Sequence, residues 1–314
     1  MYFQDIIGQS AVKKLLSFYL EGYKTTSIVP HLMFTAPRGS GKTIIATAMA
    51  KHLHDISNAG GVKKPLVTLN CSSIKTVKQF FNSFVVPHMI NRDVSVLFDE
   101  ASELPKDVTM ALLTICNPNK NGANSFVFDG TPITFDFRRL TFMFATTEGQ
   151  AIFHALMDRM KRVDLSDYSK DELWHIIELG VGNKCIMNKS IMPDVVSVLR
   201  GNARKAQQMA EDIVKYCSVR RNKNFNMADW IELKDMTGIL PLGLLKQELY
   251  LLRVIAQKIE VRLTELAAVS GLSRGSIQKD YEMYLSKMRL IEISTAGRKL
   301  TVNGKKYVDA TRDV

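Results

Sequence analysis

The stretch TAPRGSGKT, residues 35–43, places glycines, a lysine and a threonine at the spacing of a phosphate-binding loop. Glycines in such a loop let backbone N–H groups approach phosphate oxygens, while the lysine reaches the β- and γ-phosphates and the threonine hydroxyl binds Mg²⁺. The apolar run HLMF precedes the loop and the helical pattern TIIATAMAKHLHD follows it, as this motif requires. We therefore expect ATP and Mg²⁺ to bind at Pro37, Arg38, Gly39, Ser40, Gly41, Lys42 and Thr43.

Two further apolar runs end in polar residues suited to the same chemistry. The stretch VSVLFDEAS, residues 94–102, predicts a buried parallel strand that ends in Asp99 and Glu100. Asp99 would hold the Mg²⁺ shell and Glu100 would polarise the attacking water. A third predicted strand, RLTFMFATTEG, ends in Thr146 and Thr147, where a hydroxyl would contact the γ-phosphate or the water. The alternation of strands with helical stretches predicts an α/β fold with a parallel sheet.

Length and charge limit the remaining possibilities. The 314 residues are enough for two or three domains. A net charge of +11 and a pI of about 9.4 indicate either a nucleic-acid partner or a solvated basic surface. The four cysteines fit no metal-binding spacing, so we expect no structural metal. Without a signal-peptide pattern or a run of about 18 apolar residues, we expect a cytoplasmic, reduced protein that does not bind membranes.

The order of these motifs resembles that of an AAA+ ATPase, and five blocks resemble the RuvB family, the ATP-driven motors that migrate Holliday junctions. The resemblance extends, with gaps, from about residue 3 to residue 305. The blocks are DIIGQSAVKKLLSFYLEG, FMFATTEG, ALMDRMKRVDL, LRGNARKAQQMAEDI and SIQKDYEMYLSKMRLIEISTAGRKLT.

This resemblance implies roles for individual residues. Thr147 would be the first sensor, with Thr146 as the alternative, and Arg204 would be the second sensor. Arg159 would be the arginine finger that enters the neighbouring subunit's site, with Arg162 as its competitor. A finger supplied in trans implies a homo-oligomeric ring, which in this family is a hexamer. The residues implied to flank the adenine are Ile7 and Tyr168.

The chain divides into three predicted domains. Residues 1–164 form the large AAA+ ATPase domain, 165–235 a helical lid, and 236–314 a winged-helix DNA-binding domain. In the winged helix, Ser273 is expected to cap the second helix of a helix–turn–helix. The segment EISTAGRKLTVNGKKYV reads as a two-stranded wing with an exposed Gly-Arg-Lys tip. The predicted DNA contacts, made mainly to phosphates, are Arg274, Lys279, Arg298 and Lys299.

Residues 124–139 are predicted to form a β-hairpin inserted in the ATPase domain. In the resembled family a hairpin at this place docks the partner RuvA. A RuvA-like partner and packing of the hairpin on its own domain are both open interpretations. The apolar residues that would serve either purpose are Phe126, Val127, Phe128, Ile133 and Phe135.

The leading functional prediction is an ATPase that acts as an ATP-dependent DNA helicase. It would move duplex DNA to migrate four-way junctions in recombination or replication-fork repair. The alternative is a helicase- or clamp-loader-like protein, or an initiator, in which ATP switches DNA or protein affinity without processive movement. Arg38, Ser40 and Glu148 depart from the family pattern, which suggests a divergent relative, with a phage source as one expectation.

Overall fold

The computed structural model describes residues 2–54 and 62–312, which fold into two compact units. The first unit contains the chain up to Lys184 and the segment Gly201–Lys215. The second contains Cys185–Arg200 and the chain from Tyr216 onward. The predicted division into three domains at residues 164 and 235 is not decided by this partition and stays a prediction. No helix in the described ranges has the length and apolar character needed to span a membrane.

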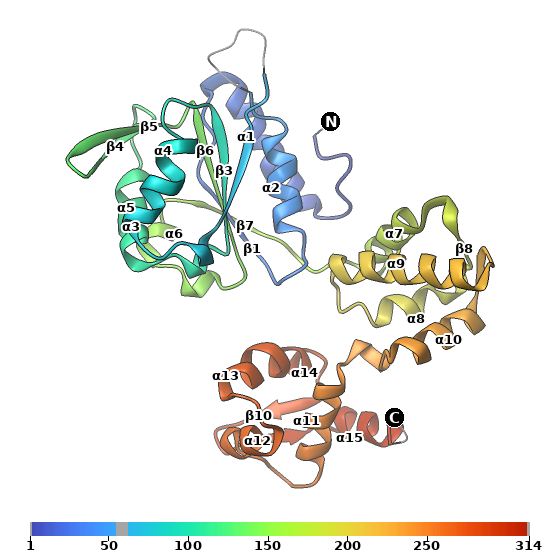
Figure 1. Cartoon of the computed structure of the whole chain (residues 1–314). Coiled ribbons are helices and arrows are strands. Elements are labelled where there is room, and N and C mark those ends of the chain that lie inside the picture. Colours follow the sequence, from blue (N-terminus) through green and yellow to red (C-terminus); the bar gives the residue numbers. More distant parts are fainter. Residues whose placement is uncertain (1, 55–61, 313–314) are drawn as a thin grey trace. The chain divides into compact units, whose positions relative to one another are not determined.

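A five-stranded sheet forms the centre of the first unit, and every neighbouring pair of its strands is parallel (Figure 1). The strand order is β2-β3-β6-β1-β7. The two apolar runs predicted as buried strands form β3 and β6, and every residue of β6 is buried. The strands are β1 (Leu32–Thr35), β2 (Leu66–Asn70), β3 (Val94–Asp99), β6 (Leu140–Thr146) and β7 (Lys161–Asp164).

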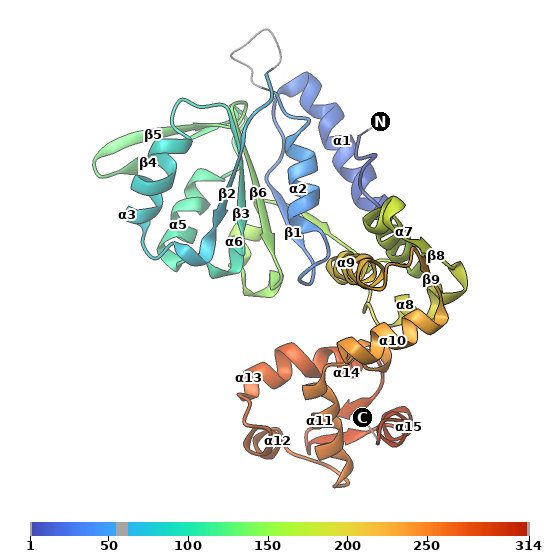
Figure 2. The same ribbon diagram turned by 45° about the vertical axis from the view of Figure 1, so that its right-hand side comes forward.

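Helices cover both faces of this sheet, as Figures 1 and 2 show. One apolar core joins α1 and α2 to the sheet, and a second core joins the other face to α3, α5 and α6. The helical pattern after the phosphate loop predicted a helix as far as residue 55, but α2 ends at Ala50. The helices are α1 (Ser10–Thr26), α2 (Lys42–Ala50), α3 (Val77–Phe80), α4 (Val86–His88), α5 (Lys106–Ile115), α6 (His154–Met157) and α7 (Lys170–Val181).

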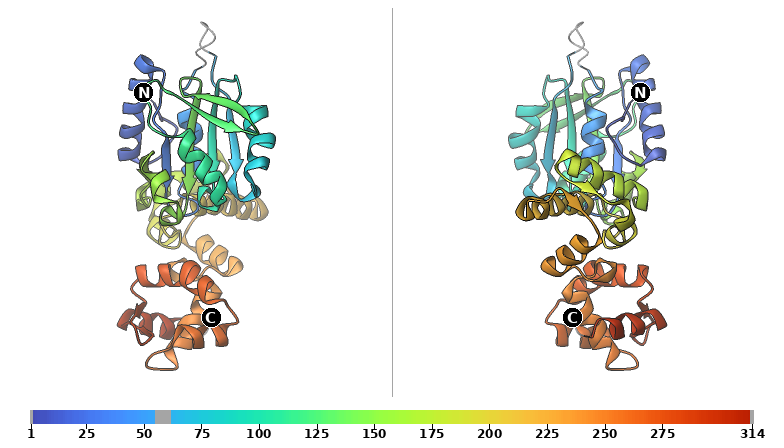
Figure 3. Two further views of the ribbon diagram at one scale, coloured as in Figure 1. Left: turned by 90° about the vertical axis from the view of Figure 1, so that its left-hand side faces the viewer. Right: turned by 90° about the vertical axis from the view of Figure 1, so that its right-hand side faces the viewer.

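The inserted hairpin is present as β4 (Ala123–Phe128) and β5 (Thr131–Asp136). Figure 3 shows it in green beside the cyan helical segment of residues 77–88. Its aromatic side chains pack on the unit's own core, since the Phe81 ring stacks on Phe128 at 4.3 Å and on Phe126 at 5.1 Å between centroids. Ile133 and Phe135 are buried as well, whereas Val127 is 65% exposed. Packing on its own domain therefore accounts for the predicted apolar residues other than Val127.

The second unit is helical, with one short parallel pair of strands and a C-terminal antiparallel pair. Ser273 begins the second helix of the predicted helix–turn–helix, and its side chain accepts the Ser276 N–H at 3.0 Å, which confirms the predicted cap. The elements are β8 (Ile186–Met187), α8 (Met192–Ser197), β9 (Asn224–Phe225), α10 (Met227–Thr237), α11 (Lys246–Ala256), α12 (Leu263–Ser270), α13 (Arg274–Ser276), α14 (Met283–Lys287), β10 (Ile291–Ile293), β11 (Arg298–Leu300) and α15 (Val302–Ala310). Helix α9 (Ala203–Arg220) contributes to both units.

Two expectations about the wing are wrong. The sequence VNGKKYV does not continue the wing, because it forms α15, which Thr301 caps through its side chain. Arg298 is also not at an exposed tip. It is 8% exposed, and its guanidinium makes two hydrogen bonds to the Glu282 carboxylate, at 2.6 and 3.0 Å. Arg298 lies in β11 opposite Ile293 of β10, and its hydrogen bonds to Glu282 place its side chain against the helix that carries this carboxylate.

Replacing Glu282 by Gln should destabilise this unit strongly. The substitution leaves the Arg298 guanidinium buried without its carboxylate, and breaking a buried pair from one side costs about 3–5 kcal/mol. Thermal unfolding followed by circular dichroism should show a lower midpoint than in Glu292→Gln, which removes an exposed partner of Lys299. Equal midpoints for the two variants would contradict a structural role for the Arg298–Glu282 pair.

Candidate nucleotide site

The phosphate loop joins the end of β1 to the start of α2. Gly41 is the residue before the helix, with φ +93°, and Gly39 has φ +79°, a region that residues with a Cβ rarely adopt. A Cβ on Gly39 would lie 2.4 Å from Asn202 Oδ1, so a side chain at this position would displace Asn202. The loop therefore presents its backbone at the N-terminus of a helix, where N–H groups and the helix dipole favour phosphate.

Lys42 lies inside the curve of this loop. Its Nζ donates to the carbonyls of Ala36 and Pro37, at 2.7 and 3.1 Å. Burial lowers the pKa of Lys42, and the nearby Glu100 and Asp99 carboxylates oppose that shift. Phosphate oxygens are stronger acceptors for an ammonium group than neutral carbonyls are, so a bound nucleotide would compete well for Lys42.

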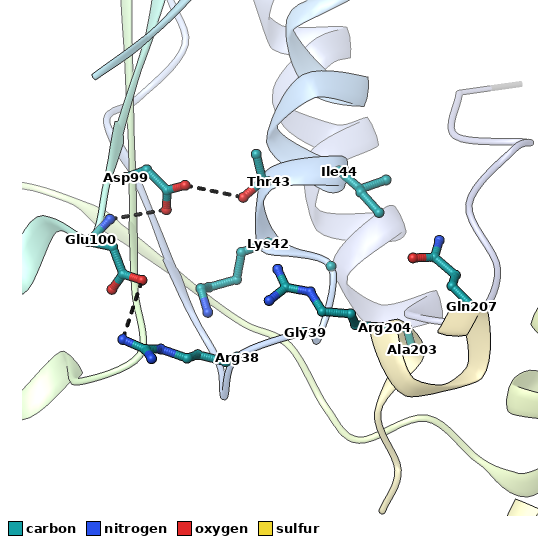
Figure 4. A pocket seen from close by; sticks show the side chains of 11 residues that line it. Arg38, Gly39, Lys42, Thr43, Ile44, Asp99, Glu100, Ala203, Arg204 and Gln207 are labelled. Carbon is teal, nitrogen blue, oxygen red and sulfur yellow. Dashed lines mark hydrogen bonds and ion pairs between the residues drawn. The ribbon is translucent and has the colours of Figure 1, made fainter. Parts of the chain in front are cut away.

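Oxygen atoms suited to Mg²⁺ converge beside the lysine (Figure 4). The Thr43 hydroxyl donates to Asp99 Oδ2 at 3.5 Å, and Asp99 Oδ1 accepts the Glu100 N–H at 3.0 Å. A hydroxyl and a carboxylate from adjacent elements are a donor set that Mg²⁺ accepts together with phosphate and water. Glu100 adopts φ +54° immediately after β3, and its carboxylate faces Arg38, with 3.9 Å between Nη2 and Oε1.

These residues line one cavity of about 410 Å³ with residues from the start of α9. The Arg204 N–H donates to the Gly39 carbonyl at 3.2 Å, and Asn202 Nδ2 donates to the Arg38 carbonyl at 2.6 Å. The predicted second sensor is thus held beside the phosphate loop. The full lining is Arg38, Gly39, Gly41, Lys42, Thr43, Ile44, Asp99, Glu100, Ala203, Arg204 and Gln207.

A neighbouring cavity of about 340 Å³ contains both residues expected to flank the adenine, Ile7 and Tyr168. The Tyr168 hydroxyl donates to the Ser40 carbonyl at 3.3 Å, and burial raises the pKa of Tyr168. The other apolar residues here are Ile6, Ile44, Ile45, Ile176, Leu179 and Ala203. The sequence analysis assigned no role to Asn202, Gln207 or Leu179, although Asn202 and Gln207 lie in the quoted block LRGNARKAQQMAEDI.

Thr147 and Arg159 line neither of these two cavities. Thr147 follows β6 and is half-buried, while the buried Thr146 hydroxyl accepts the Glu148 N–H at 3.0 Å. Arg159 follows α6, which packs on the face of the sheet opposite α2 (Figure 1). Its competitor Arg162 is exposed and paired with Asp164 at 2.7 Å.

The predicted DNA contacts all lie in the second unit. Arg274 and Lys279 are exposed at the start of the second helix of the helix–turn–helix. Lys299 is exposed on β11, where it pairs with Glu292 at 2.9 Å. Arg298 differs from the other three, because its guanidinium is occupied by Glu282.

Comparisons with known proteins divide the chain in the same order. Residues 32–168 match the model for AAA, the ATPase family associated with various cellular activities, and residues 241–309 match the RuvB C-terminal winged helix domain. The Holliday junction branch migration complex subunit RuvB of Wolbachia sp. subsp. Brugia malayi is 24% identical over 97% of this chain and 91% of its own length. The subunit of the same name from Thermosipho melanesiensis is 25% identical, over 94% of this chain and 92% of its own.

A solved structure shares the fold. The Thermotoga maritima RuvB Holliday junction branch migration motor superposes with a TM-score of 0.79, covering 98% of this chain and 97% of its own. The sequence identity is 21%. The expected order of an AAA ATPase core followed by a C-terminal winged helix is therefore confirmed.

Glu100→Gln should leave ATP binding intact and reduce turnover to near background. The amide keeps the shape of the side chain but cannot polarise water as the carboxylate does, and the phosphate contacts of Lys42 remain. Fluorescent-nucleotide titration and steady-state phosphate release measure the two properties. The matched control is Glu103→Gln, an exposed carboxylate one turn further along the chain that does not line the cavity. Turnover near that of the control would remove Glu100 from its assigned role.

Proposed function

We propose that this chain, a RuvB-like AAA ATPase, is a ring-forming motor that uses ATP hydrolysis to move duplex DNA and migrate four-way junctions. The observation that carries the proposal is the division of the site. Lys42, Asp99, Glu100 and Arg204 line a cavity at the carboxyl edge of the sheet, beside the start of α2, while Arg159 follows α6 on the face opposite α2 and lines neither nucleotide cavity. Completion of each site by the Arg159 of the next subunit accounts for this separation and makes hydrolysis depend on assembly.

Each residue then has a defined task. The loop N–H groups and Lys42 bind the phosphates, and Glu100 orients and polarises the attacking water. Thr43 and Asp99 would hold Mg²⁺, which supplies neutralisation of phosphate charge. Arg204 and the neighbour's Arg159 stabilise the negative charge that develops on the γ-phosphoryl oxygens. Ile7 and Tyr168 pack on the base, and Thr147 serves as the first sensor.

One surface binds DNA and another binds a RuvA-like partner. The winged helix contacts DNA phosphates through Arg274, Lys279 and Lys299, which makes binding largely independent of sequence and sensitive to salt. Arg298 contributes indirectly, because its pair with Glu282 fixes β11 to the helix that carries Lys279. The exposed Val127 near the hairpin tip is the place at which a RuvA-like partner would dock.

A synthetic four-way junction tests the motor. With ATP and Mg²⁺, the protein should convert a labelled mobile junction into two duplexes, and Glu100→Gln should hold the junction without converting it. The control junction has heterologous arms that prevent migration. ATP-dependent retention on the junction with no conversion by the wild-type protein would favour the loader function and contradict the motor.

Mixing two inactive variants tests the shared site. Lys42→Ala has a damaged phosphate loop and an intact finger, whereas Arg159→Ala has an intact loop and no finger. Each variant alone should hydrolyse ATP slowly. Lys42→Ala lacks the lysine that binds the phosphates, and loss of a finger costs about 10³-fold or more in GTPases. An Arg159→Ala site completed by a Lys42→Ala neighbour should regain activity in the mixture. Full activity of Arg159→Ala by itself would refute the assignment, and Arg162→Ala is the matched control.

A further inference from the structure

Within residues 2–54 and 62–312, Arg159 is held in its own subunit by neutral acceptors alone. Its Nε donates to the Leu113 carbonyl at 3.0 Å, and its two terminal nitrogens donate to the Ala155 carbonyl at 2.5 Å and to Asn117 Oδ1 at 3.2 Å. In the part of the chain that the structure describes, no carboxylate forms an ion pair with this guanidinium. The side chain is therefore ordered while its positive charge is left unneutralised.

Two of the acceptors are backbone carbonyls in helices, and the third is a side-chain oxygen. Leu113 lies in the last turn of α5, whose carbonyls carry the negative end of the helix dipole, and Ala155 lies in α6. Asn117 is different, because it is a side-chain acceptor just beyond α5. Its amide is the contact to Arg159 that a substitution can remove without changing the backbone.

Asn117 is fixed in turn by the base of the hairpin. Asn124, the second residue of β4, donates from Nδ2 to the Asn117 carbonyl at 2.6 Å and to the Ile115 carbonyl at 2.8 Å. Asn119 Nδ2 donates to Asn124 Oδ1 at 3.2 Å and to the Ala123 carbonyl at 2.8 Å. A continuous chain of hydrogen bonds thus leads from the hairpin to the guanidinium of Arg159.

We propose that Asn117 is a positioning residue for the arginine finger, and that the hairpin base fixes Asn117 through Asn124. The inference rests on the proposed function, in which Arg159 acts in the neighbouring site. A displacement of the hairpin, for example by a docked partner, is transmitted through Asn124 and Asn117 to the finger. The network changes the finger's ability to reach the next subunit and does not change the subunit's own nucleotide cavity.

A double-mutant cycle between Asn117 and Arg159 tests this proposal. Asn117→Ala should lower kcat for ATP about fivefold, the effect of one hydrogen bond, and leave KM unchanged, because Asn117 lines neither nucleotide cavity. In the Arg159→Ala background the same substitution should have no further effect. A fivefold loss in both backgrounds, or a loss confined to KM, would overturn the proposal.

Two more variants complete the test. Asn124→Ala should lower kcat in the same direction and also be silent in the Arg159→Ala background. Asn82→Ala, which changes an exposed asparagine in the same unit without a side-chain hydrogen bond in the described structure, should match wild type. Full activity of Arg159→Ala would defeat the proposed function itself, whereas slow Arg159→Ala with normal Asn117→Ala and Asn124→Ala would defeat this inference alone.

Discussion

Parallel pairing of β1 with β6, and of β6 with β3, is the constraint on which the rest of the site depends. It brings the carboxyl ends of three strands to one edge of the sheet, where Thr35 lies opposite Thr146. The phosphate loop, the Asp99–Glu100 pair and Thr147 all begin at that edge. Their residues are separated by dozens of positions in the chain, and only the register of the strands places them together.

The charged side chains around this edge favour the binding of a phosphate group. Lys42 and Arg204 face the cavity, and among the described residues Lys42 donates only to neutral carbonyls. The Asp99 carboxylate accepts hydrogen bonds from the Thr43 hydroxyl and from the Glu100 N–H, and the Glu100 carboxylate lies 3.9 Å from Arg38. Arg159, on the face of the sheet that carries α6, resembles Lys42 in this respect. Its acceptors orient the side chain without neutralising its charge. No ion pair among the described residues has to break before the Arg159 guanidinium contacts a phosphate.

Much of the fold was accessible from the sequence because its signals are local. The glycines of the loop, the apolar runs of β3 and β6, and the Ser273 cap each act within a few residues. Features that depend on distant contacts were not accessible. The Arg298 partner lies sixteen positions away, and its burial follows from packing of the wing on a helix.

The same reason explains the other features that sequence reading missed. Asn202 and Gln207 reach the site only because α9 begins beside the phosphate loop. Cys185 and Cys217 are far apart in the chain, yet their buried sulfur atoms lie 2.8 Å apart. Neither arrangement has a signature in the spacing of residues.

The central claim is that the nucleotide site is shared between subunits. The most direct measurement is an experimental structure of the protein assembled on a four-way junction with a non-hydrolysable ATP analogue. The account predicts a ring in which the Arg159 guanidinium of one subunit lies within hydrogen-bonding distance of the γ-phosphate bound by the next. An assembled structure in which no Arg159 guanidinium lies near the γ-phosphate bound by a neighbouring subunit would contradict it.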